Sequence, residues 1–227
     1  MVTSQNMQTR AVLFDLDGVL VDSMSLVERL LTRWARLQGL DPGLVLRTAH
    51  GRREADLVRT LAPAADVEAE IALMQHWQVT EFDGCAACEG AAGLTAALGT
   101  DRWAVVTSGS RAVATGRLRA AGLPVPRVLV TADDVANGKP HPEPYLTAAA
   151  ALGLDAADCV VIEDAPSGAA SGIAAGMRVI AVTGPPPRSA DGFGDVHPVR
   201  SLAQVRVVGA DEGTVVLAVP EAAGARA

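Results

Sequence analysis

The sequence predicts an α/β protein whose parallel β-sheet is covered by helices on both faces. Three observations carry this prediction. Short apolar segments alternate with helical segments from about residue 90 onward, and a purely helical block interrupts the pattern just after the first strand. Near the C-terminus, two apolar segments flank a turn-forming sequence, as in a hairpin. Alternation of strand and helix favours right-handed crossovers and parallel pairing.

The first expected strand is residues 11–15 (AVLFD), an apolar segment that ends in a carboxylate, as a buried parallel strand can. Four further strands of the same kind are expected at residues 103–107, 127–131, 159–163 and 178–183. The helices between them should end near Gly122, Gly153 and Gly176, because glycine commonly terminates helices. The expected hairpin pairs residues 204–208 with 214–219.

The helical block begins after the first strand. Either Asp22 or Ser23 is suited to cap its first helix. One face of that helix is expected to be apolar, formed by Val27, Leu30, Leu31 and Trp34. We therefore expect an α/β core at residues 1–20 and 90–227 and an inserted all-helical domain at residues 21–89.

Composition excludes several classes of protein. A formal charge of −7 argues against nucleic-acid binding, which needs a basic face. No segment approaches the roughly 18 apolar residues of a membrane helix, and residues 1–10 are polar, so we expect a cytoplasmic protein. Three cysteines do not make a disulfide framework. No exposed apolar stripe stands out, and we expect a monomer.

The basic residues are unevenly chosen. Of the 19 lysine and arginine residues, only Lys139 is a lysine. Lysine is a compact charge on a thin stem, whereas arginine is a rigid planar fork. The sequence therefore favours a site at residue 139 that needs the compact charge of lysine and has no room for the planar fork of arginine. The alternative is that a single lysine remains by chance.

Polar residues gather where the expected strands end. They are Asp15 and Asp17, Thr107, Ser108 and Gly109, Lys139, and Glu163 and Asp164. Ligands of an open parallel sheet bind at the carboxyl ends of its strands. Four carboxylates at one place would repel each other unless a hard cation such as magnesium lay between them. Hydroxyls, loop amides and an ammonium group are suited to hold phosphate.

This combination predicts phosphoryl transfer. Asp15 would attack phosphorus and form an aspartyl phosphate, and Asp17 would act as general acid and then base. Each motif alone also has a structural interpretation. The Asp-x-Asp-Gly sequence could be a turn, and the segments at Thr107 and Glu163 could be helix caps.

Four segments resemble the motifs of the haloacid dehalogenase superfamily. They are residues 14–19 (FDLDGV), 105–109 (VVTSG), 138–140 (GKP) and 161–180, which begins VIEDAPSG. Residues 49–52, 102–109 and 131–145 are most similar to the glycerol phosphatases and 2-deoxyglucose-6-phosphatases. The resemblance implies a Rossmann-like core, the haloacid dehalogenase fold, with the helical block as a cap that closes over the site.

The resemblance also implies roles for individual residues. Asp15 would be the nucleophile and Asp17 the acid/base. Magnesium would lie on Asp15, the Asp17 carbonyl and Asp164, with Glu163 as a lesser ligand or a neighbour of the ligands. The phosphoryl group would be held by Thr107, the Ser108 amide, the Gly109 loop and Lys139.

Departures from the family's patterns narrow the activity. Asp17 is usually missing from halide-removing members, and residues 19–90 hold no lysine for the Schiff base of phosphonate-cleaving members. Val27 stands where β-phosphoglucomutase relatives carry histidine. We expect hydrolysis of a small sugar or polyol phosphate. The alternatives are a phosphosugar mutase of the β-phosphoglucomutase type and a non-catalytic binding protein on the same fold.

Two cap features have weaker functional indications. His50, Gly51, Arg52 and Arg53 are expected to grip the non-phosphate end of the substrate through hydrogen bonds or charge, although an exposed helix start is the alternative. Cys85 and Cys88 have the spacing of a redox or metal pair, but no second pair exists and they lie in the expected hinge. We expect no functional role for them.

Overall fold

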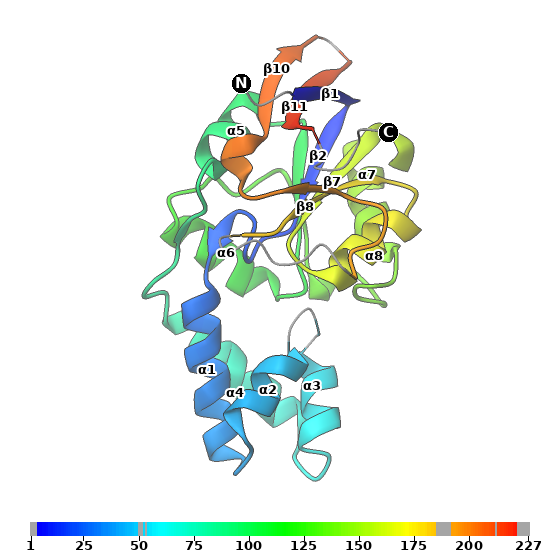
Figure 1. The fold of residues 1–227 in the computed structure, drawn as a ribbon. Coiled ribbons are helices and arrows are strands. Elements are labelled where there is room, and N and C mark those ends of the chain that lie inside the picture. The colour runs from blue at the N-terminus through cyan, green and yellow to red at the C-terminus, as the bar shows by residue number, and fades with distance from the viewer. Residues whose placement is uncertain (1–3, 50–51, 53, 185–191, 212, 222–227) are drawn as a thin grey trace.

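The computed structural model describes residues 4–49, 52, 54–184, 192–211 and 213–221. Within these ranges, six parallel strands form the central sheet, in the order β6-β5-β2-β7-β8-β9 (Figure 1). Their bounds are β2 Ala11–Phe14, β5 Trp103–Val106, β6 Val128–Val130, β7 Cys159–Glu163, β8 Arg178–Val182 and β9 His197–Val199. The predicted parallel sheet and its five expected strands are confirmed, and β9 is an additional edge strand.

Helices cover both faces of this sheet. Strand β2 is buried throughout, and its side chains alternate: Val12 and Phe14 belong to one hydrophobic cluster and Leu13 to another. Residues of α7 (Glu143–Leu152) and α8 (Pro166–Ala174) contribute to the cluster with Leu13. Residues of α5 (Ala91–Leu98) and α6 (Arg111–Ala120) contribute to the cluster with Phe14. Short 3₁₀ turns lie at η1 Ala132–Asp134, η2 Ala156–Asp158 and η3 Leu202–Gln204.

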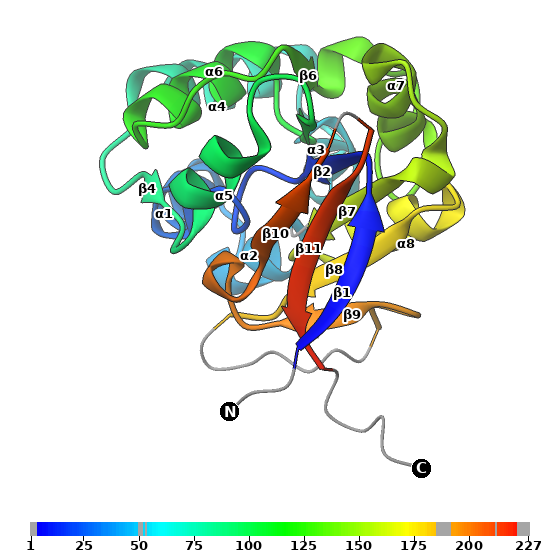
Figure 2. The ribbon, with the colours of Figure 1, turned by 90° about the horizontal axis from the view of Figure 1, so that it is seen from above.

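A second, antiparallel sheet lies on the α5–α6 side of the core (Figure 2). Strands β10 (Arg206–Ala210) and β11 (Val215–Pro220) form the predicted C-terminal hairpin. Strand β1 (Ser4–Thr9) pairs with β11 and was not predicted, because its sequence SQNMQT is polar and most of it is exposed. Buried side chains of β11, such as Leu217, join the same hydrophobic cluster as Phe14.

The inserted block is all-helical, as predicted, and has a hydrophobic core of its own. Its helices are α1 Met24–Leu37, α2 Pro42–Ala49, α3 Glu54–Leu61 and α4 Val67–Thr80. The core of this cap is formed by Leu26, Leu30, Trp34, Ala35, Val45, Leu57, Val58, Met74 and Trp77. Of the predicted apolar face of α1, Leu30 and Trp34 are buried, together with Leu26 and Ala35. Val27 and Leu31 are half-buried, and Leu31 packs against this core.

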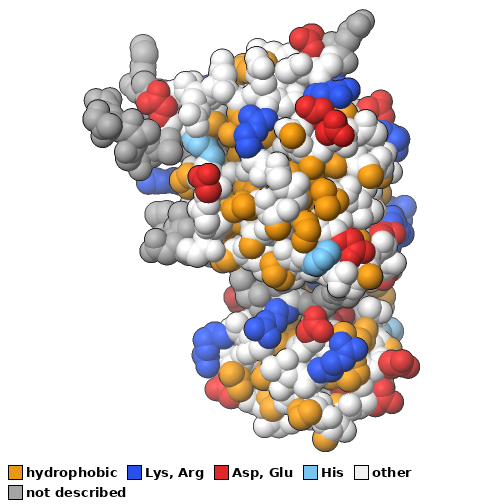
Figure 3. Space-filling model, turned by 90° about the vertical axis from the view of Figure 1, so that its right-hand side faces the viewer, with side chains coloured by type: hydrophobic (Ala, Val, Ile, Leu, Met, Phe, Trp, Pro, Cys, Tyr) orange, Lys and Arg blue, Asp and Glu red, His pale blue; other side chains and the backbone are white. Residues whose placement is uncertain are grey.

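Two short strands join the cap to the core. Strand β3 (Val21–Asp22) enters the cap, β4 (Ala86–Ala87) leaves it, and the two pair antiparallel. Figure 3 shows the resulting two lobes; the blue side chains on the lower one are arginines, because the inserted block contains no lysine. The domain boundaries at residues 20/21 and 89/90 remain a prediction, which the pairing of β3 with β4 supports. In the described ranges, none of the helices has the length and apolarity to span a bilayer.

Candidate active site

The carboxyl ends of the central strands converge on one small cavity. Its volume is about 150 Å³, and its lining residues are Asp15, Asp17, Met24, Arg52, Thr107, Ser108, Gly109, Lys139, Glu163, Asp164, Ala165 and Ser167. After β2 the chain adds β5 and β6 on one side and later β7 and β8 on the other, so this is the switch point at which open sheets bind ligands. All the site residues predicted in the α/β core therefore line one cavity.

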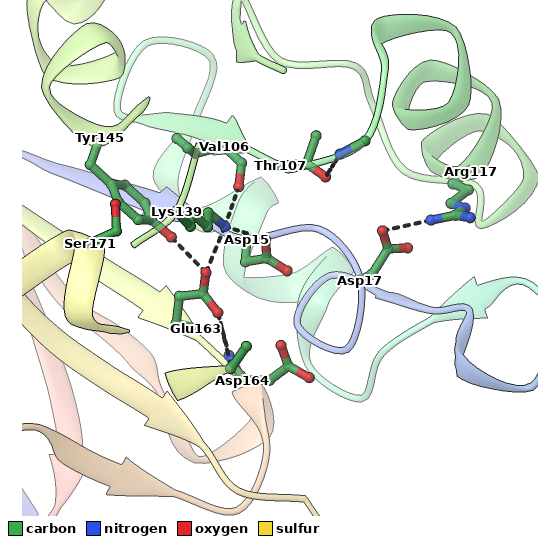
Figure 4. A network of polar contacts seen from close by, with 12 residues as sticks. Asp15, Asp17, Val106, Thr107, Arg117, Lys139, Tyr145, Glu163, Asp164 and Ser171 are labelled. Atoms are coloured by element: carbon green, nitrogen blue, oxygen red, sulfur yellow. Dashed lines mark hydrogen bonds and ion pairs between the residues drawn. The ribbon is translucent and has the colours of Figure 1, made fainter. Parts of the chain in front are cut away.

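Lys139 lies at the centre of this arrangement and points inward (Figure 4). Its side chain is only 4% exposed. Its Nζ donates to Oδ1 of Asp15 at 2.5 Å, to Oε1 of Glu163 at 2.6 Å and to the carbonyl oxygen of Val106 at 3.0 Å. Burial alone would lower the pKa of Lys139, but the two carboxylates raise it well above its ordinary value. The ammonium group of the single lysine in the chain thus has three acceptors around it, one for each of its hydrogens.

Glu163 holds this lysine and the loop after β7. Its Oε1 also accepts a hydrogen bond from the hydroxyl of Tyr145 at 3.0 Å. Its Oε2 accepts from the backbone amides of Asp164 at 2.9 Å and Ala165 at 3.0 Å. A Cβ on Gly168 would lie 1.6 Å from Oε1, so α8 can approach this carboxylate only with glycine at that position. Because four donors already occupy Glu163, its contacts are those of a group that positions its neighbours.

Three carboxylates could share a cation. Asp15, Glu163 and Asp164 each offer an oxygen, and these oxygens lie within 4.8 Å of one another. Gly18 has a φ of 86°, and a Cβ there would lie 2.2 Å from Oδ2 of Asp164, so the turn after β2 packs directly on this carboxylate. An all-oxygen donor set of this kind suits a hard divalent cation.

The raised pKa of Asp15 also indicates a site for a cation. Burial raises the pKa of Asp15 to about 7, Glu163 and Asp17 add to the increase, and Lys139 opposes it. A neighbouring cation would favour the carboxylate form and bring the pKa down again. The residues present therefore fit a divalent metal ion.

Asp17 departs from the prediction that four carboxylates share one ion. Its side chain points away from Lys139 and toward Arg117 on α6 (Figure 4). Nη1 of Arg117 donates to Oδ2 of Asp17 at 2.6 Å, and the Ser23 hydroxyl donates to Oδ1 at 2.5 Å. The structure thus places a charge-assisted pair where the sequence predicted a fourth acidic neighbour.

Sequence reasoning missed three polar groups of this site. Ser23 was predicted only as a helix cap; it stands at the N-cap of α1 but makes no capping hydrogen bond, because its hydroxyl turns to Asp17. Tyr145 lies in a segment noted for its family likeness, with nothing to mark its hydroxyl. Arg117 is one arginine among many. Only the lysine carried a compositional signal.

The loop after β5, which was predicted to bind phosphate, is tightly folded. Thr107 is buried, its amide donates to the Val130 carbonyl at 2.9 Å, and its Oγ1 accepts from the Gly109 amide at 3.1 Å. Thr107, Ser108 and Gly109 all line the cavity, as expected for a loop that holds an anion.

From the cap, Arg52 lines the same cavity and is exposed. His50, Gly51 and Arg53, the other members of the predicted substrate segment, lie outside the described residues. Cys85 and Cys88 are partly buried, and burial raises the pKa of the Cys88 thiol to about 12. A thiol with this pKa is not a ready nucleophile or metal ligand.

Comparison with known proteins gives consistent matches. The family model of haloacid dehalogenase-like hydrolases matches residues 9–176. Hexitol phosphatase A from Escherichia coli (strain K12) is 44% identical over 218 residues, which cover 93% of this chain and 100% of that protein. 2-Deoxyglucose-6-phosphate phosphatase 2 from Saccharomyces cerevisiae is 31% identical over 231 residues, which cover 91% of this chain and 94% of that protein.

Solved structures share the architecture. The crystal structure of CbbY from Rhodobacter sphaeroides in complex with phosphate aligns with a TM-score of 0.74 and 25% sequence identity. The alignment covers 86% of this chain and 96% of that one. The match thus extends over the sheet and the inserted helices together.

Proposed function

The chain belongs to the haloacid dehalogenase-like hydrolase family, and we propose that it is a magnesium-dependent phosphatase of a small sugar or polyol phosphate. The predicted family is confirmed, and the phosphatase relatives include the predicted sugar phosphatase group. One observation carries the proposal: the Asp15 carboxylate is buried against the lone ammonium, beside further carboxylates and a hydroxyl-bearing loop. We expect a cytoplasmic monomer.

The reaction assigns each described group a role. The Asp15 carboxylate attacks phosphorus, the bond to the substrate oxygen breaks, and an aspartyl phosphate forms. Asp17 donates a proton to the departing oxygen and later takes one from the water that hydrolyses the intermediate. Lys139 and the loop from Thr107 to Gly109 hold the phosphoryl oxygens.

A magnesium ion on Asp15 and Asp164, with the Asp17 carbonyl as the further predicted ligand, would neutralise negative charge on the phosphoryl group. Glu163 stays in place by its four hydrogen bonds and holds Lys139 and the Asp164 amide where they are needed.

The size of the cavity supports a small phosphorylated substrate. At about 150 Å³ it is smaller than the roughly 300–1,000 Å³ of pockets that enclose whole drug-sized ligands. The phosphoryl group fills such a space, and the rest of the substrate lies against the cap. Arg52 reaches this region and can donate hydrogen bonds to hydroxyl groups. The names of the relatives contain hexitol and 2-deoxyglucose-6-phosphate, so hexitol and deoxysugar phosphates are the first candidates.

A substrate panel tests the proposal. Phosphate release should be measured with magnesium from hexitol phosphates, 2-deoxyglucose-6-phosphate, glycerol phosphates, pentose phosphates and nucleotides. We expect the polyol and sugar esters to be hydrolysed and EDTA to stop the reaction, with recovery on adding magnesium in excess. Absence of phosphate release from every ester would contradict the proposal and favour a non-catalytic binding protein.

Product analysis separates the mutase alternative. A mutase would pass the phosphoryl group from Asp15 to a sugar hydroxyl and would convert a hexose 1-phosphate to its 6-phosphate with little free phosphate. Val27 occupies the position of the mutases' histidine, and it is a half-buried aliphatic side chain of α1. We expect free phosphate to match the substrate consumed; accumulation of an isomeric phosphate would contradict hydrolysis.

A further inference from the structure

A chain of hydrogen bonds crosses from the core into the cap and begins at Asp17. Arg117 lies on α6 of the core, and its side chain is 4% exposed. Its Nη1 donates to Asp17, and its Nη2 donates to Oε1 of Gln78 at 3.0 Å. Gln78 belongs to α4 of the cap. One planar guanidinium thus connects a core carboxylate to a cap amide in a fixed geometry.

The chain continues within the cap. Nε2 of Gln78 donates to Oε1 of Glu54, the first residue of α3. Glu54 directly follows the segment that we expect to hold the non-phosphate end of the substrate. Burial raises the pKa of the Glu54 carboxyl, and the hydrogen bond from Gln78 opposes that increase. Among side chains, an amide can accept from a guanidinium and donate to a carboxylate at the same time.

The other oxygen of Asp17 is also held from the cap side. Ser23, whose hydroxyl donates to Oδ1, is the N-cap residue of α1. It directly follows β3, the strand by which the chain enters the cap. One carboxylate oxygen of Asp17 is therefore bonded to Ser23, where the chain enters the cap, and the other to Arg117, which contacts the cap through Gln78.

We infer that Arg117 is a positioning residue for Asp17, and that Gln78 makes the position of Asp17 depend on the cap. The inference rests on the proposed function, in which Asp17 is the acid and base. Loss of the Gln78 contact would leave Arg117 with fewer buried partners, since its Nε already has none among the described residues. A buried donor without an acceptor is unfavourable, so the guanidinium would shift and Asp17 with it.

Substrates with different leaving groups show whether Gln78 and Arg117 position Asp17 or only stabilise the fold. An alkoxide leaves a sugar phosphate only with a proton from Asp17, whereas p-nitrophenolate leaves without one. A variant with a displaced Asp17 should still form the aspartyl phosphate from p-nitrophenyl phosphate and release one equivalent of nitrophenolate in a rapid burst. Slow turnover should follow, because hydrolysis of the intermediate also needs Asp17.

The test compares Gln78→Leu with Gln75→Leu, a matched substitution one turn earlier on α4 and outside this chain of contacts. Small misplacements of a catalytic group can cost up to about 100-fold in rate, and we expect Gln78→Leu to lower kcat for a hexitol phosphate about 10-fold. KM and the burst with p-nitrophenyl phosphate should be retained. Gln75→Leu should retain all three. Arg117→Lys, which keeps the charge but not the fork, should lower kcat at least as much.

A double-mutant cycle decides whether Gln78 acts through Asp17. In an Asp17→Asn background, adding Gln78→Leu should change the remaining activity by less than about twofold, because contacting residues that act together are not additive. An equal loss in both backgrounds, or an equal loss for Gln75→Leu, would overturn the inference. Absence of phosphate release by the wild-type protein would instead reject the proposed function.

Discussion

The two sides of the active-site cavity are built differently. On the core side, Lys139 and Glu163 are almost fully buried, at 4% and 1% side-chain exposure, and every polar contact is made to another fixed group. On the cap side, Arg52 is exposed, and contact with the catalytic residues runs through Arg117 and Gln78. The core side of the cavity is thus a buried polar network, whereas solvent can reach Arg52 on the cap side, and we expect the choice of substrate to depend on that side chain.

The packing of the two lobes shows the same contrast. The central sheet has a hydrophobic cluster on each face, and strands such as β2 are buried along their whole length. The cap helices bury one face around Trp34 and Trp77 and carry ion pairs at the surface, such as Arg33–Glu81 and Arg59–Asp56. We therefore expect substitutions in the core site to affect chemistry and stability together, and substitution of Arg52, a cap residue that lines the cavity, to affect selectivity. Gln78 differs from Arg52, because it contacts Arg117 and through it Asp17.

The largest expected effect is that of Asp15→Asn. An amide cannot act as the nucleophile, so phosphate release should fall below detection for every substrate. The fold should survive, because the substitution preserves shape and removes a buried carboxylate whose pKa is raised by burial. Phosphate assays and thermal unfolding of the purified variant check this. Full activity would refute the assignment of the nucleophile.

Asp17→Asn should lower kcat by roughly 10²–10⁴-fold, the usual contribution of a positioned general acid and base. The loss should be larger for alkyl phosphates than for the burst with p-nitrophenyl phosphate. Rapid-mixing measurements of nitrophenolate release, alongside steady-state phosphate release, separate the two steps. A loss of less than twofold would exclude the acid/base role.

Gly168→Ala tests whether the close packing of α8 on the Glu163 carboxylate stabilises the core side of the cavity. The added Cβ would collide with the Glu163 carboxylate, and we expect a loss of about 1–3 kcal/mol in unfolding free energy together with lower activity. The matched control is Gly93→Ala on α5, where nothing lies within 4 Å of the new Cβ. That control should gain about 0.5–1 kcal/mol, as alanine favours a helix over glycine. Equal effects in denaturant unfolding would contradict the packing argument.

On the cap side, Arg52→Ala should raise KM for the preferred sugar or polyol phosphate about 10-fold, which corresponds to about 1.4 kcal/mol. Hydrolysis of p-nitrophenyl phosphate should change little, because that ester lacks hydroxyl groups for the cap to bind. Arg47→Ala, an exposed position on α2, serves as the control. A similar loss with both substrates would assign Arg52 to the phosphoryl group instead.

The smallest effect is expected for Arg59→Ala. Its ion pair with Asp56 joins two side chains that are 63% and 56% exposed, one turn apart on α3. Pairs of this kind contribute about 0.3–0.5 kcal/mol and are screened by salt. Unfolding at low and high salt should show a difference no larger than this, and substrate kinetics should match wild type. A change in KM would place Arg59 in substrate binding.

Most of the central sheet could be predicted because its strands carry their own signal. Continuous apolar segments that end in Asp15 or Glu163 are typical of buried parallel strands with ligands at their carboxyl ends. Lys139 was identifiable because it is the only lysine. Polar residues that follow neighbouring parallel strands are expected to lie close together, and Lys139 does contact Asp15.

Other features depend on partners that are distant in sequence. Strand β1 is polar and mostly exposed, and it forms because β11 offers an unpaired edge more than 200 residues later. The pairing of Asp17 with Arg117 joins residues 100 positions apart, and no pattern distinguishes this arginine from the others. Periodicity predicted α1 and the burial of Leu30 and Trp34, but it could not show that the neighbouring apolar residues Val27 and Leu31 are only half-buried, because that depends on the helices packed against them.

The ribbon of β3 and β4 has a consequence for how such a protein can change. Val21 lies opposite Ala87 and Asp22 opposite Ala86, so the chain departs from the sheet domain and returns to it at neighbouring points. A segment whose two ends lie side by side can be exchanged for another of different length without stretching what it is attached to. New specificities could then arise by grafting a different set of helices onto an unaltered catalytic scaffold.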